Sequence, residues 1–218
     1  VEYDFLRWLG HAAFVLDADG KRIFIDPFRI GDVKEHADIV FITHSHMDHL
    51  SIDDIKKVAD QETTFVAPEE AIPKLDYKNV IKVKPGEKKK VLGIEFETIA
   101  AYNTDKQKLQ YHPHENKWVG YIISVEGKRI YHAGDTDLTE EMKKVSTDLA
   151  LIPVGGTYTM DIEEGLAATR DIRAKNFAPM HYKALLGKEG SLKLEKRFGE
   201  SVKNSIIMEE VSEPFYSF

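Results

Sequence analysis

The chain contains no cysteine among its 218 residues. Disulfide bonds, thiolate metal ligands and thiol nucleophiles are therefore excluded, and the composition suits a reducing compartment. The sequence also contains no run of 18 apolar residues and no signal-peptide pattern. Because a membrane-spanning helix needs about 20 apolar residues, we expect a soluble, cytoplasmic protein with no membrane partner.

A surplus of basic residues is also absent, since the formal net charge is -7. A protein that binds duplex nucleic acid neutralises phosphates with Lys and Arg gathered on one face. The dense basic cluster at residues 88–90 is better interpreted as a solvated turn. We therefore expect a small-molecule substrate and no nucleic acid, while the sequence leaves open whether the chain forms a homo-oligomer.

The most informative stretch is a short apolar run that ends in a cluster of metal-binding side chains. Residues 40–42 (Val-Phe-Ile) indicate a buried strand, and the ligands His44, His46, Asp48 and His49 follow within six residues. Imidazole nitrogens and carboxylate oxygens bind Zn²⁺ and its first-row neighbours. In an extended segment, side chains two residues apart share a face, so His44 and His46 can reach one ion. A turn at Met47 would direct Asp48 and His49 toward a second position.

A repeated order of elements predicts the fold. Two apolar runs around a turn, each containing Gly-Lys-Arg-Ile followed by an aromatic residue, occur at 12–27 and again at 120–132. In both places an apolar strand follows (38–42 and 148–152), and then a helix with acidic residues in its first turn (from 51 and from 161). We therefore predict one α/β domain over residues 1–218, an αββα sandwich. Its two similar halves, about 1–110 and 111–218, would pack their mixed sheets face to face with the helices outside. Generic α/β alternation without duplication is the alternative.

Later residues supply further candidate ligands. The irregular stretch 102–117 contains His112 and His114, of which we favour His112 because Pro113 would stiffen the chain after it. Asp135 follows Gly134 at the end of a predicted strand, and it either bridges two cations or caps the next helix. His181 follows the strand end at 177–180.

Other polar residues have less certain roles. His11 either lines the site as a proton donor or is a buried imidazole with its hydrogen bonds made, and Asp26 is expected to orient neighbouring ligands. We expect His132 to be structural and His36 to lie at the surface. The loop that corresponds to the His/Asp cluster in the second half lacks ligands, and its Thr157, Tyr158 and Thr159 are candidate substrate contacts.

The segment Thr43 to His49 resembles the H-x-H-x-D-H motif of the metallo-β-lactamase superfamily, and the resemblance covers essentially the whole chain. Four shorter segments look like the branch of small metal-dependent hydrolases related to ascorbate-6-phosphate lactonase: residues 8–11, 25–27, 132–136 and 179–182. The resemblance implies two divalent metals, zinc first, with manganese and iron as alternatives. It places His44, His46 and His112 on one metal, and Asp48, His49 and His181 on the other, with Asp135 bridging. Only at residues 112–114 (His-Pro-His) is the match not unique.

The resemblance implies a metal-dependent hydrolase. Two cations would lower the pKa of a water held between them, and the resulting hydroxide would attack a small ester, lactone or phosphorylated substrate. Asp48 could direct that water, and either His11 or a metal-bound water could protonate the leaving group. The alternatives are a phosphodiesterase or nuclease on the same dinuclear site, a non-catalytic metal-binding protein, and a redox relative with a thiol substrate. The sequence identifies neither the substrate nor the native metal.

Overall fold

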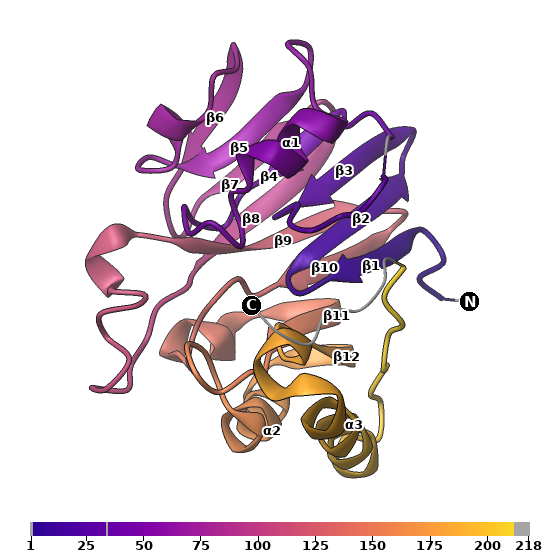
Figure 1. Ribbon diagram of the computed structural model, residues 1–218, viewed down its shortest axis with the longest axis vertical. Coiled ribbons are helices and arrows are strands. Elements are labelled where there is room, and N and C mark those ends of the chain that lie inside the picture. Colours follow the sequence, from indigo (N-terminus) through magenta and orange to yellow (C-terminus); the bar gives the residue numbers. More distant parts are fainter. Residues whose placement is uncertain (1, 34, 212–218) are drawn as a thin grey trace.

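Two six-stranded sheets form the centre of the molecule (Figure 1). In the computed structural model, which describes residues 2–33 and 35–211, their strand orders are β1-β2-β3-β4-β5-β6 and β12-β11-β10-β9-β8-β7. The first sheet consists of β1 (Leu6–Gly10), β2 (Ala13–Ala18), β3 (Lys21–Ile25), β4 (Ile39–Phe41), β5 (Thr64–Pro68) and β6 (Asn79–Val83). The second consists of β7 (Lys88–Val91), β8 (Ile94–Ala100), β9 (Val119–Val125), β10 (Lys128–His132), β11 (Ser146–Pro153) and β12 (Arg173–Met180).

Both sheets are mixed. Strands β1, β2 and β3 pair antiparallel, whereas β3 to β6 are parallel. The second sheet repeats this pattern, with β7 to β10 antiparallel and β10 to β12 parallel. The predicted repeat of hairpin, strand, helix and strand is therefore confirmed, as β2-β3-β4-α1-β5 and β9-β10-β11-α2-β12.

The position of the boundary between the halves needs correction. Strands β7 and β8 precede residue 110, yet β8 pairs with β9 over six residue pairs and belongs to the second sheet. The division between the sheets therefore falls between Val83 and Lys88. The expected boundary near residue 110 falls inside the irregular stretch 102–117, which joins two neighbouring strands of the second sheet, β8 and β9.

The core explains why the strands are so apolar. In β2, Phe14 and Leu16 face the cluster between the sheets, while Ala13 and Val15 face a second cluster under α1. A strand buried on both faces needs apolar residues at successive positions, and β2 shows this pattern.

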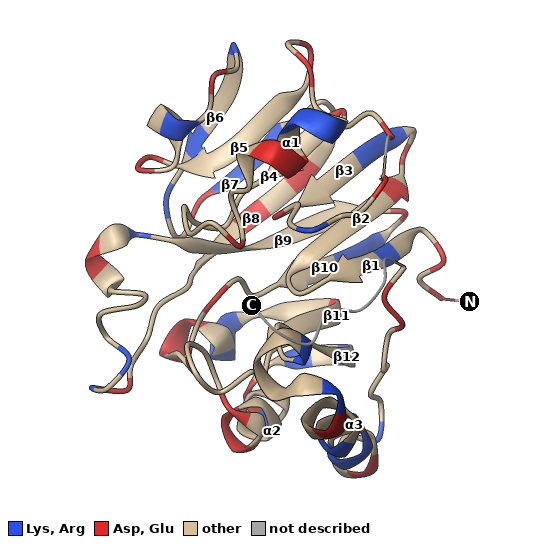
Figure 2. Cartoon of the chain, in the orientation of Figure 1, with Lys and Arg blue, Asp and Glu red and all other residues tan. Residues whose placement is uncertain are grey.

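The helices cover the outer faces of the two sheets. Helix α1 (Ile52–Val58) packs on the first sheet through Ile55 and Val58, and α2 (Ile162–Asp171) and α3 (Lys183–Ser201) lie on the opposite side of the molecule, against the second (Figure 1). Figure 2 shows acidic residues at the start of α1 and basic residues at its end, the order that the helix dipole favours. Three 3₁₀ turns complete the elements: η1 (Ile72–Lys74), η2 (His114–Asn116) and η3 (Glu140–Lys144). Among the described residues, no helix has the length and apolarity to cross a membrane.

Candidate metal centre

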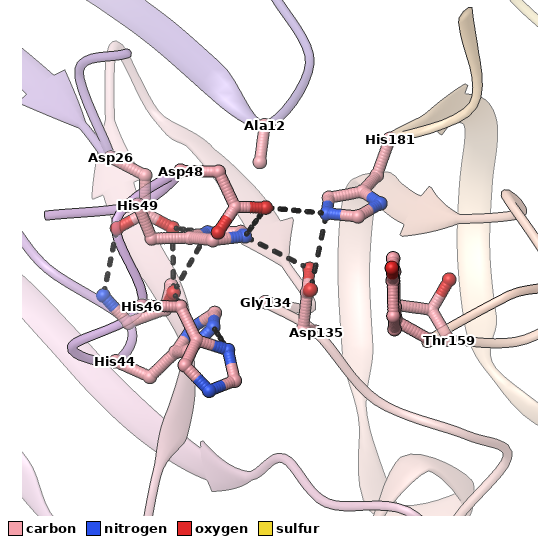
Figure 3. A network of polar contacts seen from close by, with 12 residues as sticks. Ala12, Asp26, His44, His46, Asp48, His49, Gly134, Asp135, Thr159 and His181 are labelled. Atoms are coloured by element: carbon pink, nitrogen blue, oxygen red, sulfur yellow. Dashed lines mark hydrogen bonds and ion pairs between the residues drawn. The ribbon is translucent and has the colours of Figure 1, made fainter. Parts of the chain in front are cut away.

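Every residue predicted to bind metal lies in a segment that follows the carboxyl end of a strand. His44, His46, Asp48 and His49 follow β4, His112 lies in the long loop after β8, Asp135 follows β10 and His181 follows β12. Parallel strands end at the same edge of a sheet, which brings the segments of each sheet together. A backbone hydrogen bond from His181 to the carbonyl of His11, the residue after β1, joins the two sheets here (3.0 Å). The side chains of His44, His46, Asp48, His49, Asp135 and His181 converge in one cluster (Figure 3), and the donor atoms of His112 lie within 4.8 Å of those of His44 and His46.

The first group of donors is His44, His46 and His112, whose ligand atoms all lie within 4.8 Å of one another. Nε2 of His44 is 3.1 Å from Nδ1 of His46. Two donors that are each about 2.1 Å from a tetrahedral zinc ion are about 3.4 Å apart. The spacing of this pair therefore fits two ligands of one ion.

The second group is His11, Asp48, His49 and His181. Oδ2 of Asp48 is 3.6 Å from Nε2 of His49 and 3.5 Å from Nε2 of His181. These distances again suit donors that share one small cation.

Asp135 lies between the two groups. Its Oδ1 is 3.3 Å from Nε2 of His49, and its Oδ2 is 3.1 Å from Nε2 of His181 and 3.3 Å from Nε2 of His112. One carboxylate thus contacts histidines of both groups, as a bridging ligand requires. The alternative role as a helix cap is excluded, because Thr139 occupies the N-cap position of η3.

Several atoms at this point are buried and lack a hydrogen bond. Within the described part of the chain they include Nε2 of His49, His112 and His181, and Oδ1 of Asp135. Some of these atoms are at ion-pair distance from each other, but without the geometry of a hydrogen bond. A buried polar atom left unpaired costs about 1–3 kcal/mol, so four that converge on one point indicate a missing charge. Divalent cations satisfy this requirement.

The pKa values of two ligand histidines also indicate that positive charge is required at this point. Burial lowers the pKa of His181, but the carboxylates of Asp135 and Asp48 outweigh it and raise that pKa to about 9. For His49, burial is likewise outweighed by Asp135 and Asp48, and the pKa is raised well above its usual value. The facing carboxylates thus demand positive charge, which protons supply in the metal-free protein and cations can replace.

Neighbouring residues fix the orientation of the ligand histidines. Asp26 accepts a hydrogen bond from Nδ1 of His49 (2.7 Å) and two more from the backbone and hydroxyl of Thr43. Asn103 accepts from Nδ1 and from the backbone of His112 (3.0 and 3.1 Å). Such contacts leave the opposite ring nitrogen, Nε2, directed at the metal position. Asp26 thus lies where its expected role requires, whereas Asn103 was missed, although it begins the same polar loop as His112.

His11 is the buried fourth member of the second group. Its Nε2 lies 3.0 Å from Oδ2 of Asp48, and its ring centroid is 3.7 Å from that of His181. Burial, aided by the charge of His181, lowers the pKa of His11 to about 4. Near neutral pH the ring is therefore uncharged, and the tautomer with a proton on Nε2 donates a hydrogen bond to Asp48.

The remaining histidines lie apart from the cluster. His114 is exposed in η2 and packs against the ring of Tyr102, at 4.5 Å between centroids. His132 is buried and donates to the carbonyl of Ala12 (2.9 Å), and His36 is an exposed partner of Asp60. The structure thus distinguishes the two residues: His112 is buried within the cluster, and His114 is exposed outside it.

A cavity of about 270 Å³ opens onto the cluster. It is lined by His46, Met47, Asp48, Tyr111, His112, Asp135 and Tyr158. Of the three residues predicted to touch substrate, Tyr158 lines this cavity, whereas Thr157 is exposed and Thr159 is buried with its hydroxyl on the carbonyl of Met160. Met47 and Tyr111 were missed; each directly adjoins a predicted ligand in the sequence, which was the available signal.

Comparison with known proteins agrees with this geometry. The model of the beta-lactamase superfamily domain matches residues 5–181. A UPF0173 metal-dependent hydrolase of Alkaliphilus metalliredigens is 32% identical and aligns over 98% of this chain and 99% of its own length. The fold and the site define a metal-dependent hydrolase. The chain belongs to the metallo-β-lactamase superfamily, in which its relatives carry the name UPF0173 metal-dependent hydrolase.

Solved structures show the same relationship. A protein of Parabacteroides distasonis, provisionally named a metal-dependent hydrolase, superposes with a TM-score of 0.82 at 32% identity, covering 94% of this chain and 92% of that one. A Thermotoga maritima protein with the provisional name zinc-dependent hydrolase gives a TM-score of 0.57 at 28% identity, covering 82% and 75%. The αββα architecture expected from the sequence is thereby confirmed.

Proposed function

We propose that this chain hydrolyses an ester or lactone bond of a small molecule at a centre of two divalent cations, with zinc as the first choice. The observation that supports the proposal is the pair of donor groups joined by one carboxylate, Asp135, at the floor of a cavity. The provisional name of the Thermotoga maritima protein supports zinc, and the donors are of the nitrogen and oxygen types that zinc accepts.

In this proposal each group of donors holds one ion. His44, His46 and His112 hold the first, and Asp48, His49 and His181 hold the second, while Asp135 contacts both. When bound, the two cations would activate water as a nucleophile near neutral pH and would polarise the carbonyl group of the substrate.

The protein's own contribution is orientation and proton handling. Asp48 lines the cavity, so its carboxylate can accept a hydrogen bond from the attacking water and direct it. His11 donates to Oδ2 of Asp48 and thereby fixes the rotation of that carboxylate. Asp26 and Asn103 hold the ligand imidazoles rigid, which keeps the reacting geometry constant from one turnover to the next.

The test is metal content and esterase activity of the wild type beside Asp135→Asn. We expect two metal ions per wild-type chain and hydrolysis of simple esters and lactones. Asparagine keeps the size but removes the charge that offsets two cations, so at least one ion should bind more weakly. Substitution of a residue that only orients a metal ligand lowers metal affinity or activity by about 10–100-fold. Asp135 is proposed to be a ligand itself, so its substitution should lower activity by more than about 100-fold.

Asp105→Asn is the matched control. Asp105 lies in the loop that contains His112, where its carboxylate accepts a hydrogen bond from the backbone of Gln107, a contact that asparagine can also make. Circular dichroism should show an intact fold in both variants. Normal metal content and normal activity in Asp135→Asn would reject the bridging role, and one ion or none in the saturated wild type would reject the two-metal centre.

A further inference from the structure

The outer wall of the cavity above the cluster is apolar. Met47, between the ligands His46 and Asp48, has 77% of its surface exposed, and Tyr158 has 36% exposed. Both residues line the cavity together with Tyr111. Exposed apolar side chains that gather at a concave site, beside a few polar groups, are the usual lining of a ligand pocket.

The two tyrosines form a fixed pair. Their ring centroids are 4.8 Å apart with an angle of 84° between the planes, an edge-to-face contact. Asn103 holds both loops, because its amide nitrogen donates to the carbonyl of Tyr158 (2.9 Å) while its oxygen accepts from His112 (3.1 Å). The aromatic wall is therefore built at a constant position relative to the metal ligands.

Positive charge is missing from this wall. No described residue that lines the cavity is Lys or Arg. The same loop contains three lysines: Lys106 and Lys117 are exposed and do not line the cavity, and Lys108 has only 12% of its side chain exposed. Its ammonium group is bound by Asp137 (3.3 Å), Glu164 (3.2 Å) and the carbonyl of Thr159 (2.9 Å). An anionic group placed against this wall, away from the metals, would meet aromatic rings and Met47 with no basic side chain of the lining to pair with, which is unfavourable.

The size of the cavity also limits the ligand. A cavity of about 150 Å³ is enough for benzene in another protein, and the present one measures about 270 Å³. It therefore has room for one ring together with the ester group that reacts.

We propose that the substrate, under the hydrolase function argued above, carries an uncharged ring or a similar apolar group that packs against Tyr111, Tyr158 and Met47. The scissile carbonyl then lies over Asp135 and Asp48. Water adds to the carbonyl carbon, the carbon–oxygen bond to the leaving group breaks, and one water proton passes to the departing oxygen, giving an acid and an alcohol. A phosphate group placed against this wall would find no basic side chain of the lining to pair with.

Three acetate esters test the proposal kinetically: benzyl acetate, ethyl acetate and 4-(acetoxymethyl)benzoate. They differ in the ring and in its charge but share the reacting bond. We expect kcat/KM for benzyl acetate to exceed that for the other two by roughly tenfold, since ring contacts and burial stabilise the neutral ring alone. Tyr158→Ala should lower kcat/KM for benzyl acetate toward the value for ethyl acetate and thereby remove most of this preference.

Leu109→Ala is the matched control, because Leu109 is an exposed apolar residue of the same loop that does not line the cavity. It should leave all three rates unchanged. A higher kcat/KM for the anionic ester, or equal values for benzyl and ethyl acetate, overturns the proposed substrate class while leaving the hydrolase function intact.

Binding of acetophenone, which is not hydrolysed, gives a result that does not depend on turnover. Calorimetry on the metal-loaded protein should show binding that weakens at least about fivefold in Tyr158→Ala and not in Leu109→Ala. Ring-dependent binding without hydrolysis of any ester would reject the proposed reaction but retain the apolar subsite. Acetophenone binding that is absent, or equal in wild type and Tyr158→Ala, would reject the subsite itself.

Discussion

Three residues at the centre hold backbone angles that L-amino acids rarely adopt. The φ angles are 53° at His11, 45° at Asp26 and 58° at His181. Such conformations cost about 1–3 kcal/mol each and persist where the surrounding structure enforces them. All three side chains contact the ligand cluster, so the strain accompanies the positioning of polar groups and does not serve stability.

The fluorescence of Trp118 can be used to measure metal binding at the first group of donors. Its ring lies 4.8 Å from His44, 4.9 Å from His46 and 5.6 Å from His112 between centroids, while the other tryptophan, Trp8, packs against Phe14 and Tyr182. Ion binding at the first group of donors should therefore change the fluorescence of Trp118.

His112→Ala should abolish most of that fluorescence response, because it removes one of three donors to the first ion. His114→Ala is the control, since His114 is exposed and outside the cluster, and it should retain the response. Metal titration of both variants, followed by tryptophan fluorescence and by hydrolysis rate, checks the assignment. A lost response in His114→Ala with a normal one in His112→Ala would show that the loop binds metal through the other histidine.

At the scale of elements, the loops behind the cluster depend on close approach between backbones. The loop after β11 passes directly against the residue that follows β12, and a Cβ atom at Gly155 would collide with the carbonyl oxygen of His181 and with Leu185. Backbone atoms cannot turn aside as a flexible side chain can. Glycine is therefore required at this position by packing.

Gly155→Ala should displace His181 and weaken the second ion by roughly tenfold or more, the scale expected when a ligand is poorly oriented. It should also destabilise the fold by about 1–3 kcal/mol through overpacking. Gly199→Ala is the control: it lies in α3 with open space at its Cβ, and alanine there should stabilise by about 0.5–1 kcal/mol. Denaturant unfolding and metal titration measure both effects; equal stabilities would contradict the predicted clash.

The elements themselves were largely predictable, and the long-range contacts were not. The two hairpins and the helix starts at Ser51 and Asp161 depend on local pattern, and the structure confirms them. The motif from His44 to His49 is also local, and the structure brings its side chains together. The pairing of β8 with β9 across 101–118 depends on register between distant segments, which periodicity does not encode. Asn103 contacts Tyr158 on a loop of the distant segment after β11, a contact that no local pattern encodes.

At the scale of the whole molecule, each donor group draws on both sheets. The first combines His44 and His46 from the first sheet with His112 from the second, and the second combines Asp48 and His49 with His181. Ions bound at these groups would therefore connect the two halves. At a free metal concentration 1,000 times the Kd, one ion stabilises the folded state by about 4 kcal/mol. For a chain of this size that corresponds to a Tm increase of roughly 8–16 °C.

The stability of the metal-free protein should itself depend on pH, and the direction follows from the raised pKa of His181. His181 has a pKa of about 9 in the folded metal-free protein, against about 6.5 in an unfolded chain. The folded state therefore binds more protons than the unfolded state between these values, so this contribution to stability is complete below pH 6.5 and is lost as pH rises through 9. His49, whose pKa is also raised, acts in the same direction.

A metal ion must displace those protons, so metal affinity should increase up to tenfold per pH unit for each proton released. The difference in Tm between the metal-loaded and metal-free protein should accordingly widen from pH 6.5 to 9. Thermal unfolding at a fixed, buffered concentration of free zinc measures this difference. His114→Ala should behave as the wild type, whereas His181→Ala should show a smaller dependence on pH, because it lacks one proton that the metal displaces. A difference in Tm that stays constant across this range would mean that the carboxylates of Asp48 and Asp135 are compensated by something other than protonated histidines in the metal-free state.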